Sequence, residues 1–203
     1  MKPINLDRIV AIFRQSIDKY HILDDVHQAD CNPYALESLE HLCFHKNWID
    51  TVQWHQEDLI RDPNIAPIHA LEIKRKIDQL NQQRTDMVEQ LDSIYYRFFE
   101  YVSVDESAAL NTESPAWAID RLSILCLKIY HMHIEANRTD SEEEQRSLCQ
   151  YKLDILNEQL LDLTAAIAQL FEDYASGKRK MKVYRQMKMY NDPTLNPVLY
   201  KKD

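Results

Sequence analysis

The chain has 203 residues and a formal net charge of −9, and its 45% hydrophobic and 28% charged residues are typical of a folded globular protein. Its single glycine, Gly177, argues against the glycine-rich loops that bind nucleotide phosphates. The four cysteines form no close pair, which argues against disulfide frameworks and zinc knuckles and predicts a reducing, cytoplasmic location. No apolar run is long enough to predict a membrane span.

The first two helices are predicted from hydrophobic spacing and from their ends. Apolar residues recur at helical spacing over residues 4–20, which predicts a first helix there. Asn32 followed by Pro33 has the order of an N-cap and a first helical residue. The second helix is therefore predicted to begin at this pair and to continue to Arg61, just before Pro63.

The third and fourth helices are separated by a polar stretch. Residues 67–102 keep one apolar face throughout and predict the third helix. Ser114 before Pro115 is a second pairing of N-cap and proline, and it predicts a fourth helix that ends near Asn137.

The fifth helix and the C-terminal segment complete the predicted order. Ser141 and Glu144 fit a capping box, and Gly177 suits a left-handed residue after the last turn. The fifth helix is therefore predicted between them. Residues 178–190 are predicted to form a short sixth helix, followed by an extended end from Pro193 onward.

Long helices joined by short turns predict an all-α fold, an antiparallel bundle of four to five long helices with a short C-terminal helix and an extended basic tail. Residues 1–177 would form the bundle, and residues 178–203 would pack on the same domain. This tail holds eight Lys/Arg and two Asp, a charge of +6 that leaves −15 on the body. We expect the tail to cross its own bundle or a second subunit in a homodimer. A protein this acidic is not expected to bind nucleic acid.

The second predicted helix carries the main functional signal, because its apolar stripe turns polar halfway along. Charged side chains on an inward face are costly unless they are paired or coordinate a ligand. They predict either an internal salt-bridge network or a binding pocket. Continued at heptad spacing, the inward positions are Asn47, Asp50, Trp54, Glu57 and Arg61, with Asp58 alongside.

The third and fourth helices carry further charges at the edge of the predicted core. Arg84 falls inside an apolar stripe, where a guanidinium group needs an anion. The fourth helix is apolar nearly all round, so it is predicted to be central, and charges on such a helix are paired or line a cavity. The residues are Lys74, Asp78 and Asn81 on the third helix and Asp120, Arg121 and Lys128 on the fourth.

Two kinds of metal site are compatible with the sequence. Asp58, Asp78 and Asp120 could hold Mg²⁺ or Mn²⁺ through oxygen ligands, although their spacing does not require a metal. No other cofactor is indicated.

A zinc site is the second possibility, since His41, His45 and His55 share one sector of the second helix. However, Lys46 and Gln56 flank this sector, and no fourth ligand is implied. Ordinary surface histidines are the better interpretation.

Four motifs together point to a known family. They are WHQED at residues 54–58 with Arg61, KRKID at 74–78 with Asn81, Gln82 and Arg84, SP at 114–115 with IDRLSIL at 119–125, and KVYRQMKMYNDP at 182–193. The chain resembles the bacterial domain-of-unknown-function family numbered 4254 over nearly its whole length. This family is uncharacterised, so the resemblance implies no activity, cofactor or catalytic residue. It implies only a place beside envelope glycosyltransferases, and so a link to envelope polysaccharide synthesis. Where the family reads Glu-Gln-Arg, this chain has Glu158-Gln159-Leu160.

Two hypotheses follow from these residues. The first is a charged pocket between helices that binds a small anionic metabolite, such as a nucleotide, nucleotide sugar or sugar phosphate, and that could support metal-assisted phosphoester hydrolysis. The second is a non-catalytic interaction or scaffold protein whose buried charges are structural. In the pocket hypothesis the cations are Arg61, Lys74, Arg84, Arg121 and Lys128, and the carboxylates that orient them or hold the metal are Glu57, Asp58, Asp78 and Asp120.

Overall fold

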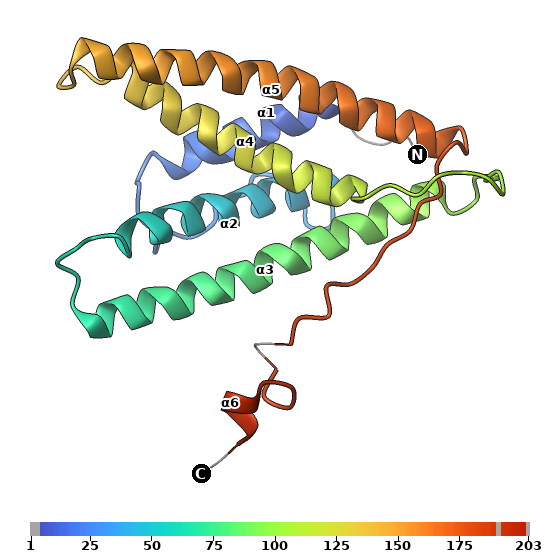
Figure 1. Cartoon of the computed structure of the whole chain (residues 1–203), viewed down its shortest axis with the longest axis horizontal. Coiled ribbons are helices and arrows are strands. Elements are labelled where there is room, and N and C mark those ends of the chain that lie inside the picture. Colours follow the sequence, from blue (N-terminus) through green and yellow to red (C-terminus); the bar gives the residue numbers. More distant parts are fainter. Residues whose placement is uncertain (1–4, 190–191, 202–203) are drawn as a thin grey trace.

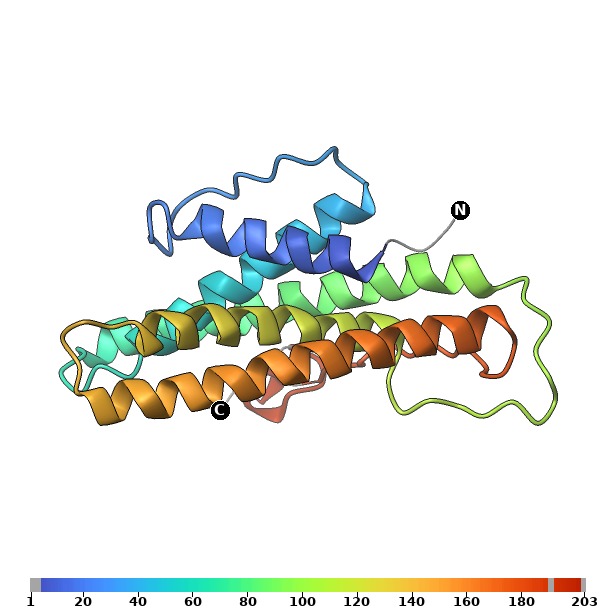
Figure 2. The same cartoon turned by 90° about the horizontal axis from the view of Figure 1, so that it is seen from above.

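The computed structural model describes residues 5–189 and 192–201 and confirms the predicted all-α bundle, with no β-strand in that part of the chain (Figure 1). The helices are α1 (Leu6–Tyr20), α2 (Leu39–Leu59), α3 (Pro67–Phe99), α4 (Pro115–Ala136), α5 (Glu143–Ala175) and the short α6 (Pro197–Tyr200). In Figure 2, α1 lies over one face of the bundle, where it packs on α2 and α4. None of the described helices combines the length and apolarity needed to cross a membrane.

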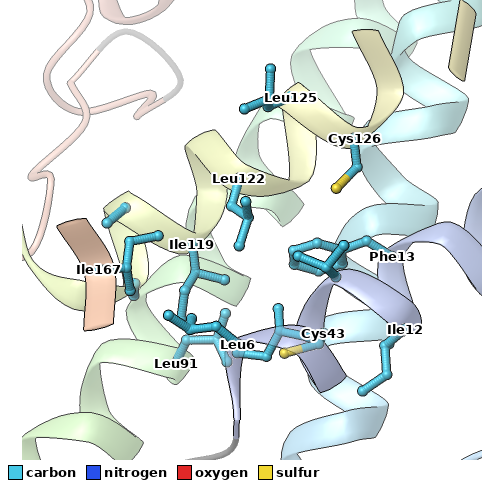
Figure 3. Close-up of a cluster of buried hydrophobic side chains, with 14 of the residues drawn as sticks. Leu6, Ile12, Phe13, Cys43, Leu91, Ile119, Leu122, Leu125, Cys126 and Ile167 are labelled. Carbon is cyan, nitrogen blue, oxygen red and sulfur yellow. The ribbon is translucent and has the colours of Figure 1, made fainter. Parts of the chain in front are cut away.

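Helix α4 is the centre of the fold, as its all-round apolar sequence predicts. It packs against α1, α2, α3 and α5, and its Leu122 side chain is fully buried. Figure 3 shows the surrounding cluster, with Phe13 from α1, Cys43 from α2, Leu91 from α3 and Ile167 from α5. Burying a side chain such as Leu122 contributes about 1.5 to 3 kcal/mol to stability. The core therefore holds any polar group carried by α4 in a fixed position.

The start of α4 is confirmed at the predicted cap. The Ser114 hydroxyl accepts a hydrogen bond from the Trp117 N–H (3.3 Å), and Pro115 occupies the first turn. The same hydroxyl donates to the buried carboxylate of Asp92 on α3 (2.8 Å), which also accepts from the Ala116 N–H (3.3 Å). Burial raises the pKa of Asp92, and these two hydrogen bonds act in the opposite direction. The N-cap therefore joins α4 to α3 as well as starting the helix.

The predicted start of α2 at Asn32 and Pro33 is wrong. Helix α2 begins at Leu39, and Ser38 is its N-cap, accepting from the His41 N–H (3.0 Å). The Asn32 side chain accepts a hydrogen bond from the Tyr34 N–H (3.1 Å), which forms a local turn across Pro33. This local hydrogen bond competes with helix formation, so the proline that follows Asn32 belongs to a turn.

At the ends of α5, one prediction is wrong and one is confirmed. The N-cap is Glu142, without a side-chain cap bond, because the Ser141 hydroxyl donates to the Arg138 carbonyl (2.9 Å). At the other end Gly177 has φ +72°, the left-handed conformation predicted for it. A Cβ at this position would clash with the carbonyl oxygen of Ser103, so the close approach also requires glycine.

The predicted sixth helix over residues 178–190 is wrong, because residues 178–189 form no helix, and residue 190 lies outside the described residues. This segment leaves the end of α5 and passes α3 (Figure 1). The Gln186 N–H donates to the Glu89 carboxylate (3.1 Å), and the Lys188 ammonium donates to the Asn81 carbonyl (3.0 Å). These contacts with α3 replace helical hydrogen bonds. The tail thus crosses its own bundle.

A short turn of helix, α6, interrupts the extended end that was predicted after Pro193. Pro197 is its first residue, and the Asn196 side chain caps it by accepting from the Val198 N–H (3.0 Å). Proline suits this position because its fixed φ is helical and it has no N–H to leave unpaired. The prediction of a fully extended end missed this proline start.

Candidate functional site

Four charged side chains from three helices meet in the interior of the bundle. Lys46 of α2 is fully buried and forms ion pairs with Asp50, one turn further on, and with Asp120 of α4 (Nζ to Oδ1, 2.8 Å). Arg84 of α3 donates two hydrogen bonds to Asp120, from Nε to Oδ1 (2.8 Å) and from Nη2 to Oδ2 (2.5 Å). Paired bonds of this kind fix both groups in one geometry. We call these four residues the buried charge network.

Two neutral side chains extend the network. The Ser123 hydroxyl of α4 donates to Asp50 Oδ2 (2.6 Å), and the Asn47 amide of α2 donates to the Ser123 oxygen (2.9 Å). Asp50 Oδ1 lies 3.4 Å from Arg84 Nε but has no hydrogen-bond partner among the described residues, and the same is true of Asn47 Oδ1. With two cations and two carboxylates, the network has no net charge when all four groups are ionised.

The two carboxyl groups differ in proton affinity. Burial raises the pKa of Asp50, although Lys46 opposes this effect. Burial also acts to raise the pKa of Asp120, but attraction to Lys46 and the hydrogen bonds from Arg84 outweigh it, so the pKa of Asp120 lies below its usual range. Asp120 is therefore the fixed anion of the network, and Asp50 is the group that takes up a proton first.

The network opens to the surface on one side, through Arg84. Its side chain is 27% exposed and lines a cleft of about 580 Å³ between α3, α4 and α5. Its bonds to Asp120 use Nε and Nη2, which leaves Nη1 without a hydrogen bond to any described residue. We call this cleft the α4–α5 cleft. Its polar lining residues are Arg84, Glu113, Asp120, Arg121, Lys128, Gln159 and Asp162, and its apolar ones are Ile124, Leu125, Leu163 and Ala166.

The other two cations of the α4–α5 cleft differ from Arg84. Arg121 is exposed and pairs with Glu113 (2.9 Å). Lys128 forms no ion pair within the described part of the chain. The cleft therefore holds one ammonium group and one guanidinium nitrogen that are available to an anion.

The structure brings together only some of the predicted site residues. Asn47, Arg84 and Asp120 belong to the network or its extension, and Arg121 and Lys128 line the cleft that it reaches. Asn81 lies apart, where its side chain accepts from Gln53 and its carbonyl accepts from the tail. Trp54 stacks on His131 (4.8 Å between ring centroids). Lys74 and Asp78 pair with each other on the exposed face of α3.

The predicted inward position of Glu57 and Arg61 is wrong. Arg61 is exposed and Glu57 is partly exposed, and the two form an ion pair one turn apart near the end of α2 (3.2 Å). The prediction assumed a strict seven-residue repeat, but a straight α-helix drifts by about 20° per heptad from such a repeat. By the end of α2 the stripe has turned away from the core.

The three predicted carboxylate ligands occupy three different environments. Asp120 is held by Lys46 and Arg84, Asp78 by Lys74, and Asp58 lines a separate cleft beside His55. Among the described residues, only three histidines form a group with the ligand spacing of a metal site, and none of the three carboxylates belongs to it. The three aspartates therefore cannot bind one Mg²⁺ ion together.

The histidine sector predicted on α2 is also divided. His45 bonds to Asp30 (2.5 Å), and His41 Nδ1 lies 3.2 Å from the Tyr34 carbonyl oxygen. His55 lies apart from both, beside His21 and His131.

Sequence reasoning missed Lys46, because it was placed on a surface sector together with Gln56, and both are buried. The available signal was its spacing of four from Asp50, which places an opposite charge one turn away on the same face.

Residues 40–183 match the family described as "Protein of unknown function (DUF4254)". This is well over half of the chain, so the protein belongs to that family, as its motifs indicated. The matched region covers nearly all of α2 and the whole of α3, α4 and α5, and it contains all four residues of the buried charge network. No match was found among curated proteins, and none among solved structures.

Proposed function

We propose that the protein binds a small anionic metabolite in the α4–α5 cleft, of the class of nucleotides, nucleotide sugars or sugar phosphates. The observation that carries the proposal is Arg84, a guanidinium group that lines the cleft, is fixed by buried carboxylates and keeps one nitrogen, Nη1, without a bond to the described residues. Arg84 is prepared for a ligand because its counter-charges, Asp120 and Asp50, hold it in place before the ligand arrives, which lowers the entropy cost of binding.

The rest of the α4–α5 cleft suits such a ligand. Lys128 supplies a cation without an ion pair among the described residues, and Arg121 can exchange Glu113 for a phosphate oxygen. Ile124 and Leu163 provide an apolar wall for a sugar or a base. A volume of about 580 Å³ lies within the usual range of small-molecule sites, roughly 300 to 1,000 Å³.

A divalent cation would enter with the ligand. Mg²⁺ commonly binds through one or two carboxylates together with substrate phosphates, and Glu113 and Asp162 are the cleft carboxylates outside the buried charge network. The proposal concerns binding. Metal-assisted hydrolysis and the link to envelope polysaccharide synthesis stay predictions from the sequence.

Lys128→Gln tests the cleft with little risk to the fold, because Lys128 makes no ion pair with the described residues. In the wild-type protein, a matching ligand at about 100 times its Kd should add roughly 2.7 kcal/mol of stability, which raises Tm by on the order of 5 to 10 °C. We expect Lys128→Gln to weaken the affinity by about tenfold or more, since it removes a charged hydrogen bond. Thermal unfolding against phosphorylated metabolites, with and without Mg²⁺ or Mn²⁺, measures both effects.

Lys74→Gln is the matched control, because Lys74 is also an exposed lysine, lies on α3 and is outside the cleft lining. It should leave ligand affinity unchanged. A ligand whose affinity falls equally in both variants binds elsewhere and contradicts the proposal.

The second candidate function, a non-catalytic interaction protein, is favoured by two observations. The buried charge network is balanced without any ligand. The tail also presents exposed apolar side chains, among them Tyr184, Met187 and Val198. Such side chains are typical of a surface that a partner or a second copy covers.

A chain that ends at Lys182 separates the two candidate functions. It keeps Arg179, which pairs with Asp173, and Met181, which packs on the core, so the bundle stays covered. If the tail joins two subunits, light scattering should show a dimer for the full chain and a monomer for the shortened one. An unchanged mass, together with unchanged ligand affinity, would favour the α4–α5 cleft alone.

A further inference from the structure

Three histidines from separate elements converge away from the α4–α5 cleft. His21 caps the C-terminus of α1, His55 lies on α2 and His131 on α4. One ring nitrogen of each lies within 4.8 Å of those of the other two. The Nε2 atoms of His21 and His55 are 3.2 Å apart. None of the three belongs to the network or lines the α4–α5 cleft.

The hydrogen bonds around the cluster leave nitrogen lone pairs that face one another. His21 Nδ1 lies 2.7 Å from the Ile17 carbonyl oxygen, so Nδ1 carries the proton and donates it, and Nε2 presents its lone pair to the cluster. Histidines that bind metals commonly donate their other ring nitrogen to a backbone carbonyl in this way. His131 Nε2 is buried and has no hydrogen-bond partner in the described part of the chain.

Aromatic rings hold the imidazoles in place. The Trp54 indole stacks on His131 with 3° between the ring planes, and Tyr20 stacks on His55 at 13°. Burial lowers the pKa of His131 to about 4 and also lowers that of His55, which favours the neutral ring, the form that binds metals.

A purely structural histidine cluster explains only part of this arrangement. An N–H···N hydrogen bond from His55 to His21 would account for their 3.2 Å separation. It leaves the buried Nε2 of His131 without a partner, which costs about 1 to 3 kcal/mol. A cation among the three rings would satisfy all of them.

We propose that His21, His55 and His131 bind one divalent transition metal ion of the Zn²⁺ class. Ligand nitrogens at 2.0 to 2.1 Å from a tetrahedral Zn²⁺ lie about 3.3 Å from each other. The pair formed by His21 and His55 already has this separation, and the His131 nitrogen, within 4.8 Å of the other two, would move closer on binding to complete the triangle. Three imidazoles select Zn²⁺, Co²⁺, Ni²⁺ or Cu²⁺ over Mg²⁺ and Ca²⁺.

The fourth coordination position faces solvent. Asp24 Oδ1 lies 3.9 Å from His21 Nε2 and 3.8 Å from His55 Nε2, and its side chain is 60% exposed. Asp24 and His55 also line a surface cleft of about 740 Å³, together with Asp58. The fourth ligand is therefore the Asp24 carboxylate or a water molecule in that cleft.

Titration of the full-length, tag-free, metal-stripped protein with Zn²⁺ tests the site. We expect one equivalent to bind, and Co²⁺ to give the visible absorption of a four-coordinate ion. Loss of a supporting residue outside the coordination sphere costs roughly 10- to 100-fold in affinity. Loss of a ligand should exceed that, so His131→Gln and His55→Gln should each weaken Zn²⁺ binding by more than about 100-fold.

His45→Gln is the matched control, because it removes another partly buried α2 histidine that already has a carboxylate partner, Asp30. It should bind Zn²⁺ as the wild type does. Circular dichroism of each variant establishes that it is folded, and two ligand variants guard against the failure of one. The proposal is overturned if folded His131→Gln and His55→Gln bind like the control, or if the wild-type protein binds no Zn²⁺.

Discussion

Lys46→Met is expected to lower the free energy of unfolding by about 3 to 5 kcal/mol, the usual cost of removing one partner from a buried ion pair. The change leaves the buried carboxylates of Asp50 and Asp120 with only Arg84 to neutralise them. The loss should be smaller in mildly acidic buffer. Burial raises the pKa of Asp50 in the folded state. The folded state therefore binds a proton more readily than the unfolded state, and lowering the pH favours folding. Denaturant unfolding at several pH values measures both effects.

Two further variants control this experiment. Lys76→Met makes the same change on the exposed face of α3 and should alter stability by less than about 0.5 kcal/mol. Lys46→Met combined with Asp50→Asn removes one charge of each sign and should be more stable than Lys46→Met alone. If the double variant is instead the less stable by the full cost of a second substitution, the two groups are not coupled as the geometry indicates.

Arg84→Met should produce a different pair of effects. Its stability loss should be smaller, about 2 to 3 kcal/mol, because the partly exposed guanidinium is screened by solvent. The affinity for the phosphorylated ligand should fall by more than about tenfold, since the cleft loses both the bond from Nη1 and the fixed positive charge of the guanidinium group. Lys46→Met, studied where it is still folded, should keep most of its ligand affinity because Lys46 does not line the cleft.

Arg84→Lys sharpens the comparison. It keeps the positive charge but cannot form the two parallel bonds to Asp120. We expect an affinity between those of the wild type and Arg84→Met. Equal ligand affinity in Arg84→Met and Lys46→Met would show that the network supports the fold without serving the α4–α5 cleft.

The fold was largely predictable because local signals mark most helix ends. Ser114 and Pro115 start α4 and Gly177 follows the end of α5, as predicted. The tail was mispredicted because the contacts that hold Gln186 and Lys188 in a non-helical segment, those with Glu89 and Asn81, come from distant α3. Spacing within the tail itself carries no information about them.

The candidate site was predictable in part. An arginine inside an apolar stripe and charges on a central helix pointed to Arg84 and Asp120, which do meet. Lys46 was missed because the sequence does not show which polar sector of α2 faces inward. The histidine cluster was missed because His21 and His131 come from elements far from α2 in sequence, and only tertiary packing places them beside it.

The pair of hydrogen bonds between Arg84 and Asp120 also bears on how the helices align. Seams of leucine and isoleucine tolerate sliding, and α3 displaced along α4 by one turn, about 5.4 Å, would still bury apolar surface. In that arrangement Asp120 would lose Arg84 and be left beside Lys46, with Asp50 as its competitor. We therefore expect the network to favour a single alignment of the three helices, at the cost of part of the stability that a purely apolar core would give.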